Sequence, residues 1–238
     1  ISPSHPVPLA APGMVKKGLK GMFNPESPFY IHPRLDPGLL WWLWKYFRSC
    51  RREQMERGMP VLRDLTYHSL QLFKEIVASE RIDFGFEHRG LLVLFNSEKG
   101  EMDNRHEAEL AHRMGVDARM LTNAELNALE PDVKITARGG LFYPNDAHCI
   151  PDQFVKQLSE TAKKAGAVFF TQTEILSVTK EKNLIVSVTT ANGTLRANEF
   201  VLSAGSWSRP MMRQLGIHLL VYPGKGYSVT IPRLERQN

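Results

Sequence analysis

Phe-Val-Leu-Ser-Ala-Gly-Ser-Trp, residues 200–207, is the stretch that decides the fold of this chain. Phe200 to Ser203 form a short apolar run, as in a strand that is covered on both faces. Ala204, Gly205 and Ser206 then bring no large side chain, and a glycine lets the backbone approach a ligand closely. Because open α/β sheets hold ligands at the carboxyl ends of their strands, the stretch predicts a binding turn. The alternative is an ordinary strand-to-helix turn in which Gly205 supplies only an unusual φ.

The residues around this turn predict alternating strands and helices. Asn192-Gly193 predicts a hairpin turn with left-handed φ, and a helix is expected from Trp207 to Leu215, ended by Gly216. The expected strands in this half of the chain are 168–171, 175–179, 184–190, 219–222 and 227–231.

The first half of the chain carries clear helix boundaries. Asp36 and Pro37 predict the start of an apolar helix, and a second helix is expected from about Pro60. Thr122-Asn-Ala-Glu125 is a capping box for a short helix that ends before Pro131. Other expected elements are a hairpin or helix at 14–23, two strands within 84–95 around Arg89-Gly90, a helix at 99–114, a strand at 141–143 and a helix opened by Pro151, with Phe154, Val155, Leu158 and Ala162 on its inner face.

Composition and charge bound the class of protein. The chain has 238 residues, is 42% hydrophobic and has two cysteines without a paired spacing, so we expect a globular core without a disulfide framework or zinc site. The net charge is +5, and all of it lies before residue 59, where nine Lys and Arg stand against four Asp and Glu. This excess adjoins the apolar stretches 14–23 and 39–47, which favours a membrane surface over nucleic acid. A solvated basic edge is the alternative.

Several motifs together resemble the FAD-dependent D-amino-acid oxidase superfamily. They are the Pro144-Asn145-Asp146 turn, a helix closed by Ala165-Gly166-Ala167, Thr173-Glu174-Ile175 at a strand start, the Asn-Gly hairpin and the 200–207 stretch. Residues 7–13, 141–146 and 221–232 are similar to the bacterial D-amino acid dehydrogenases of that superfamily. The likeness covers nearly the whole chain. It departs at both ends, because the chain has no Gly-x-Gly-x-x-Gly, and we expect a central piece of a longer enzyme.

The resemblance implies an α/β (α+β) fold, in which a substrate-binding mixed sheet with helices joins part of a Rossmann-like FAD-binding domain. It implies that main-chain atoms of Ile175 and of Ser203, Ala204 and Gly205 contact FAD, and that Ile1 and Ser2 lie near the flavin ring. Trp207 is a further candidate, with packing of the following helix as its alternative role. No catalytic side chain and no metal ligand is assigned. We expect His148 and the Asn145-Asp146 turn to be structural.

The resemblance also implies an activity and its partners. The expected full-length enzyme deaminates a D-amino acid oxidatively to a 2-oxo acid and ammonia and passes electrons to a respiratory acceptor. We expect this piece alone to bind no FAD tightly and to be inactive. A glycine or sarcosine type oxidase that uses oxygen is one alternative, and a non-catalytic basic module on a membrane surface is another. We expect a cytoplasmic protein, with peripheral attachment to the inner face of the cytoplasmic membrane as a further expectation. We expect no nucleic acid as a partner. The implied segments are 1–25, an entry segment near the flavin; 26–143 and 217–238, the substrate-binding domain; and 144–216, part of the FAD-binding domain.

Overall fold

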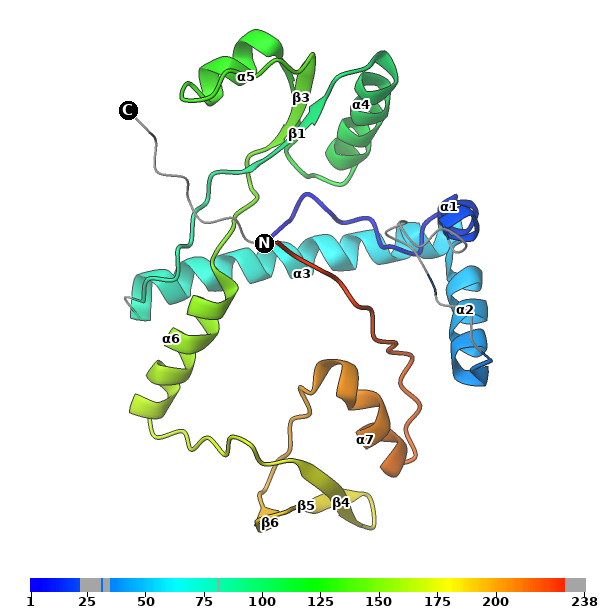
Figure 1. Ribbon diagram of the computed structural model, residues 1–238, viewed down its shortest axis with the longest axis vertical. Helices are drawn as coiled ribbons and strands as arrows, with labels where there is room; N and C mark the ends of the chain where they lie inside the picture. Colours follow the sequence, from blue (N-terminus) through cyan, green and yellow to red (C-terminus); the bar gives the residue numbers. More distant parts are fainter. Residues whose placement is uncertain (22–30, 32–34, 81, 230–238) are drawn as a thin grey trace. The chain divides into compact units, whose positions relative to one another are not determined.

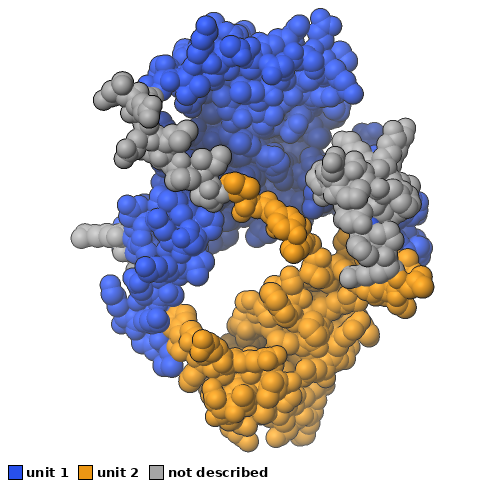
Figure 2. Space-filling view, viewed as in Figure 1, with its two compact units in different colours: residues 1–34, 44–168 blue, residues 35–43, 169–238 orange. Residues whose placement is uncertain are grey.

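The computed structural model describes residues 1–21, 31, 35–80 and 82–229 of the chain. These residues form two compact units, which Figure 2 shows in different colours. Unit 1 comprises residues 1–34 and 44–168, and unit 2 comprises residues 35–43 and 169–238. The domain boundaries implied by the family resemblance remain a prediction.

Unit 1 contains a three-stranded antiparallel sheet with the order β1-β3-β2, where β1 is Leu91–Phe95, β2 is Arg119–Thr122 and β3 is Gly139–Tyr143. Leu91 lies opposite Tyr143, and Phe95 lies opposite Gly139. A side chain at position 139 has no room, because an added Cβ would lie 2.7 Å from Cζ of Phe95 and 2.8 Å from the carbonyl oxygen of Leu121. Gly139 therefore permits the close approach of the three strands.

Two capped helices flank this sheet (Figure 1). Helix α4, Glu98–Arg113, begins at Ser97, whose hydroxyl accepts a hydrogen bond from the Gly100 N–H. Helix α5, Asn123–Leu129, begins with the predicted capping box, and both of its reciprocal hydrogen bonds are present. The signals that predicted both helices are local in sequence, and both predictions are confirmed.

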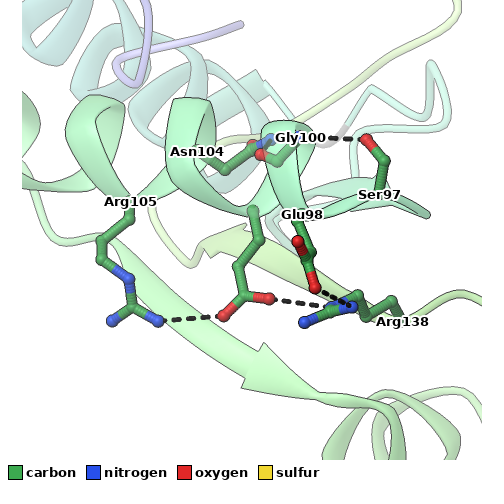
Figure 3. Close-up of polar contacts among 7 residues, drawn as sticks. Ser97, Glu98, Gly100, Asn104, Arg105 and Arg138 are labelled. Atoms are coloured by element: carbon green, nitrogen blue, oxygen red, sulfur yellow. Dashed lines mark hydrogen bonds and ion pairs between the residues drawn. The ribbon is translucent and has the colours of Figure 1, made fainter.

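An ion-pair network joins the first turn of α4 to the residue before β3 (Figure 3). Arg138 Nε lies 2.9 Å from Glu101 Oε2, and Arg105 Nη2 lies 3.1 Å from Glu101 Oε1. Hydrogen bonds from Arg138 and then Arg105 lower the pKa of Glu101. The network is solvent-exposed and has a structural role.

The core of unit 1 lies between α4 and the sheet. Its buried residues are Ala108, Ala111, Val116, Ala118, Leu141 and Tyr143. A second, aromatic cluster contains Phe73, Phe84, Phe86 and Phe154, with ring centroids of Phe154 4.9 Å from those of both Phe73 and Phe84. It connects three distant segments of the same unit.

The remaining helices of unit 1 are α1, Met14–Gly21; α3, Arg52–Glu80; and α6, Pro151–Lys164. The predicted start of α3 at Pro60 is wrong, because the helix begins eight residues earlier and Pro60 lies inside it. Ion pairs one turn apart, Arg52 with Glu56 and Glu53 with Arg57, support the extra turns. Residues 22 and 23 of the predicted basic segment lie outside the described residues.

Helix α2, Pro37–Ser49, begins in unit 2 and ends in unit 1. Asp36 caps it as predicted, since its Oδ1 accepts hydrogen bonds from the N–H groups of Gly38, at 2.9 Å, and Leu39, at 3.2 Å. Leu39 is buried, whereas Leu40, Trp41, Trp44 and Phe47 are exposed. No described helix is long and apolar enough to cross a bilayer.

Unit 2 contains the antiparallel sheet β4-β5-β6, formed by Ile175–Glu181, Leu184–Thr190 and Gly193–Arg196. A short 3-10 helix, η1, spans Gly205–Trp207, and α7, Ser208–Gln214, follows it and packs beside β4 (Figure 1). Gly216 has a φ of +77° and ends α7, with the Ile217 N–H bound to the Met212 carbonyl. Gly193 has positive φ as predicted, but Asn192 does not.

Several expected strands are absent from the described residues. Residues 200–203 have no regular secondary structure, and Val201 is 89% exposed. Residues 168–171 and 219–222 are not strands either, nor are residues 227–229 of the strand expected at 227–231, whose residues 230 and 231 lie outside the described residues. Of the two strands expected within 84–95, only β1 forms, and the other is reduced to a single bridge from Glu87 to His148. A strand forms only where a neighbouring backbone can pair with it, and apolar composition alone does not supply one. The α+β class is confirmed, with both described sheets antiparallel rather than mixed.

The inner face expected for α6 is only partly correct. Phe154 packs against Phe73 and Phe84, but Val155 is 65% exposed and Leu158 is 39% exposed. An amphipathic pattern identifies the apolar side of a helix but not the surface that covers it.

Candidate functional site

The predicted binding turn, Ser203 to Trp207, lies on the surface of unit 2. Gly205 has a φ of +51°, and no atom lies within 4 Å of the position that a Cβ would occupy. Trp207 is 75% exposed, so it does not pack in the core of its unit. The Trp207 N–H binds the Ala204 carbonyl at 3.0 Å, which closes the turn. The turn therefore presents small residues and open backbone.

Ile175, whose main chain is also predicted to contact the cofactor, is the first residue of β4. It pairs with Thr190 of β5, and its side chain is 39% exposed. A register shift follows it, between Ile175 and Ser177. Its side chain is therefore not buried by the described residues, and its main chain lies at an irregular end of the sheet.

Ile1 and Ser2 belong to unit 1, where they lie beside the Pro144–Asp146 turn. The terminal amino group of Ile1 donates to the Ala147 carbonyl at 2.8 Å, and the Ala147 N–H donates to the Ile1 carbonyl at 2.9 Å. The Ser2 carbonyl accepts from the His5 N–H at 3.2 Å. Ile1 is thus held by main-chain bonds to a residue 146 positions away, whereas Ser2 bonds only within the N-terminal segment.

A buried carboxylate continues this attachment. Asp146 is 2% exposed; its Oδ1 accepts from the Ser4 N–H at 2.9 Å, and its Oδ2 accepts from the Ser4 hydroxyl at 2.6 Å. The Ser4 Oγ also lies 2.7 Å from His5 Nδ1. Since the one Ser4 proton goes to the carboxylate, His5 Nδ1 must carry a proton and donate it to Oγ. The Asp146 carboxylate therefore has a structural role, in which it holds the N-terminal segment to the turn.

Tyr143 lies beside His5 of this network, with the two ring centroids 6.4 Å apart. Its hydroxyl donates to Glu107 Oε1 at 3.1 Å, and the Tyr143 side chain is almost fully buried. Burial, and then the nearby charge of Glu107, raise the pKa of Tyr143 well above its usual range. Tyr143 is therefore a neutral, structural donor at all ordinary pH values.

His148 has the structural position that was expected. Its backbone pairs with Glu87 in an antiparallel bridge, and its ring Nε2 lies 3.9 Å from Glu87 Oε2. No group of three or more His, Cys, Asp or Glu residues within the described ranges is placed to hold a metal ion.

Comparison with known proteins places the chain in a family. The family described as DAO, FAD dependent oxidoreductase, matches residues 29–238. The chain belongs to this FAD-dependent oxidoreductase family. The match includes the turn at 203–207 and the sheet that begins at Ile175.

Relatives of this FAD-dependent oxidoreductase are found by sequence and by structure. A protein named D-amino acid dehydrogenase from Vibrio cholerae is 32% identical over 240 residues, covering 100% of this chain and 57% of the relative. One of the same name from Vibrio vulnificus is 29% identical. The chain therefore spans a little over half the length of these relatives. Glycine oxidase from Bacillus cereus has a TM-score of 0.59 and 26% identity over 64% of this chain and 43% of its own.

The described residues fit part of an FAD site. The open face at Gly205 leaves room for a ligand against the backbone, and the N–H groups of Ser203 to Ser206 make no hydrogen bond to any described residue. Such free main-chain donors suit the polar parts of a dinucleotide. The sequence holds no Gly-x-Gly-x-x-Gly to bind the pyrophosphate, so these residues account for only a portion of the cofactor contacts.

Proposed function

We propose that the chain forms part of an FAD-dependent D-amino acid dehydrogenase, which converts a D-amino acid to an imino acid that hydrolyses to a 2-oxo acid and ammonia. The observation that carries this proposal is the 32% identity to the Vibrio cholerae protein over the whole chain. A respiratory acceptor is the proposed destination of the electrons.

The proposed role of this chain is positioning. Main-chain atoms of Ile175 and of Ser203 to Gly205 hold the cofactor, with Trp207 beside them, and Ile1 and Ser2 border its ring. When bound, FAD supplies the two-electron oxidation chemistry. Hydrogen bonds from the Ile1 amino group to the Ala147 carbonyl and from the Ser4 N–H to Asp146 fix the segment that begins with Ile1, which keeps it in one place relative to the rest of unit 1.

A reduction experiment tests the proposed activity. We expect the flavin absorbance of the full-length protein to bleach when D-alanine is added without oxygen, and not when L-alanine is added. Rapid peroxide formation in air would instead favour the glycine or sarcosine type oxidase. Absence of bleaching with a panel of D-amino acids would refute the assignment.

A matched pair of glycine substitutions tests the cofactor contact. Gly205 and Gly216 both have positive φ and open space around an added Cβ, so alanine causes similar backbone strain at both positions. We expect Gly205→Ala to lower the flavin content of the full-length protein and Gly216→Ala to leave it unchanged. Equal flavin content in the two variants would contradict the placement of FAD at this turn.

We also propose a division into two domains. The substrate-binding domain comprises residues 26–143 and 217–238, and residues 144–216 form part of the FAD-binding domain. The two compact units of the structure divide at residue 168, within the proposed cofactor portion. Limited proteolysis of the full-length protein with and without FAD tests the division: we expect FAD to protect sites within 169–216 more strongly than sites within 98–137. Equal protection of both ranges would argue against it.

We propose that the full-length protein attaches peripherally to the anionic surface at the inner face of the cytoplasmic membrane. On α2, Trp41 and Trp44 are half exposed, and Lys45 and Arg48 lie 5.5 Å and 5.1 Å from the Trp44 ring. Aromatic and basic side chains together suit the headgroup region.

Vesicle sedimentation tests this attachment. We expect Lys16→Glu, Lys17→Glu and Lys20→Glu together to weaken binding of the full-length protein to anionic vesicles at low salt. The control changes Lys156, Lys163 and Lys164 of α6 to Glu, which alters the net charge equally. Equal loss in both variants would indicate a general charge effect and no specific surface.

A further inference from the structure

A pocket in unit 2 has the composition of an anion site. It has a volume of about 300 Å³ and is lined by Asp36, Ser206, Arg209, Pro210, Arg213, Tyr222 and Pro223. This volume is about ten times the ~30 Å³ that one water molecule takes in the liquid, so a small polyatomic ion fits with its first waters. Ser206 belongs to the predicted binding turn and Asp36 to a predicted helix cap, but neither the sequence patterns nor the family match assigns a role to the two arginines.

Two guanidinium groups supply the positive charge. Arg209 and Arg213 lie one turn apart on α7, and neither forms an ion pair with any described residue. Like charges at this spacing repel each other, and an anion between them removes that cost. Each guanidinium has five N–H donors in a planar fork that matches the oxygens of a phosphate group.

Arg209 is held in place before any ligand binds. Its guanidinium carbon lies 4.5 Å from the centroid of the Tyr222 ring, a cation–π arrangement. Its Nη2 also lies against Gly38, where an added Cβ would be only 2.6 Å away. A fixed guanidinium loses less side-chain entropy when it binds a ligand.

The acidic residue in the pocket does not compete for the arginines. Asp36 Oδ1 accepts from the first N–H groups of α2, and Oδ2 accepts from the Tyr222 hydroxyl at 2.5 Å. These donors compensate the carboxylate locally. Two arginines and one aspartate leave the lining with one net positive charge.

We propose that this pocket binds a phosphate group through Arg209 and Arg213, with the Ser206 hydroxyl as a further donor. A dianionic phosphate satisfies two guanidinium groups better than a single carboxylate does. Ser206 directly follows Gly205 in the turn assigned to FAD, so the phosphate of a nucleotide is one source and free inorganic phosphate is the other. The nucleotide source rests on the proposed function; the phosphate chemistry does not.

Calorimetric titration of the 238-residue chain with inorganic phosphate at low salt tests the site. We expect the double variant Arg209→Gln/Arg213→Gln to bind phosphate at least about tenfold more weakly, because it loses both charged donors. The control double variant, Arg113→Gln/Arg196→Gln, removes the same charge away from the pocket and should bind as the parent chain does. Equal weakening in both, or no phosphate binding by the parent chain, would overturn the proposal.

A variant that keeps every charge provides an independent check. Gly38→Ala forces the Arg209 guanidinium to move, so we expect weaker phosphate binding with an unchanged circular dichroism spectrum. Full affinity in this variant would place the anion elsewhere. A parallel titration with ADP separates the sources: tighter binding than phosphate, lost in Arg209→Gln/Arg213→Gln, assigns a nucleotide phosphate, and equal affinity assigns free phosphate. Flavin reduction by D-alanine in the full-length protein is measured separately, so failure of either proposal leaves the other distinguishable.

Discussion

Replacing Ser4 with alanine should destabilise unit 1, because it removes the short hydrogen bond from Ser4 Oγ to Asp146 Oδ2. That bond is 2.6 Å long and ends on a carboxylate that is 2% exposed, so water cannot take the place of the hydroxyl. A hydrogen bond to a charged group contributes about 1.5 to 3 kcal/mol, and we expect a loss of this size in the free energy of unfolding. The bond from the Ser4 N–H to Oδ1 survives the change and limits the loss.

A double-mutant cycle isolates this interaction. We expect Asp146→Asn to cost about 1 kcal/mol or more, because the neutral amide weakens both bonds from Ser4. The loss of unfolding free energy in the double variant should then be about 1 kcal/mol smaller than the sum of the losses in the two single variants, as is usual for contacting residues. Ser49→Ala is the control, since its hydroxyl binds the Lys45 carbonyl on an exposed helix surface and its loss should change stability by less than about 0.5 kcal/mol.

Urea denaturation followed by circular dichroism measures these free energies, and hydrogen exchange gives a local readout. The amides of Gly90 and Ala147 bind the Asp146 and Ile1 carbonyls, so their exchange should accelerate in Ser4→Ala. Strict additivity in the cycle, or unchanged exchange at both amides, would refute the assignment of Asp146 as the anchor of the N-terminal segment.

Three further predictions concern unit 1. The lowered pKa of Glu101 stabilises the fold at pH values above the ordinary glutamate pKa of about 4.3, and this contribution is lost as the pH falls below that value. Because Arg138 is the main cause of the lowered pKa, Arg138→Gln should raise the Glu101 titration midpoint measured by NMR. The raised pKa of Tyr143 contributes to the stability of the fold, in full below the ordinary tyrosine pKa of about 10, and this contribution is lost as the pH rises above that value. Glu107→Gln should lower the titration midpoint of Tyr143 measured by ultraviolet absorbance, and an unchanged midpoint would contradict the stated role of the Glu107 charge. Thr122→Ala removes one half of the capping box and should cost about 1 kcal/mol in urea denaturation, whereas Thr122→Ser should cost little.

The sequence by itself determined the features whose physical cause is local. Asp36 before Pro37, the Thr122 capping box and Gly216 after α7 each act through hydrogen bonds within a few residues, and all three lie where they were predicted. The family likewise follows from residues that the chain shows directly, because the motifs around 141–146 and 200–207 are contiguous stretches.

Only the tertiary structure decided the features that depend on a distant neighbour. Residues 200–203 have the composition of a buried strand, yet they lack a paired backbone among the described residues and are not a strand. Asp146 binds Ser4 across 142 positions and Tyr222 binds Asp36 across 186, and no periodicity in the sequence records such pairs. The reason is that an Asp or Arg residue reads the same in the sequence whether its side chain lies in solvent or beside a partner. The pKa and the hydrogen bonds of that side chain are set by the groups that folding brings within hydrogen-bonding distance.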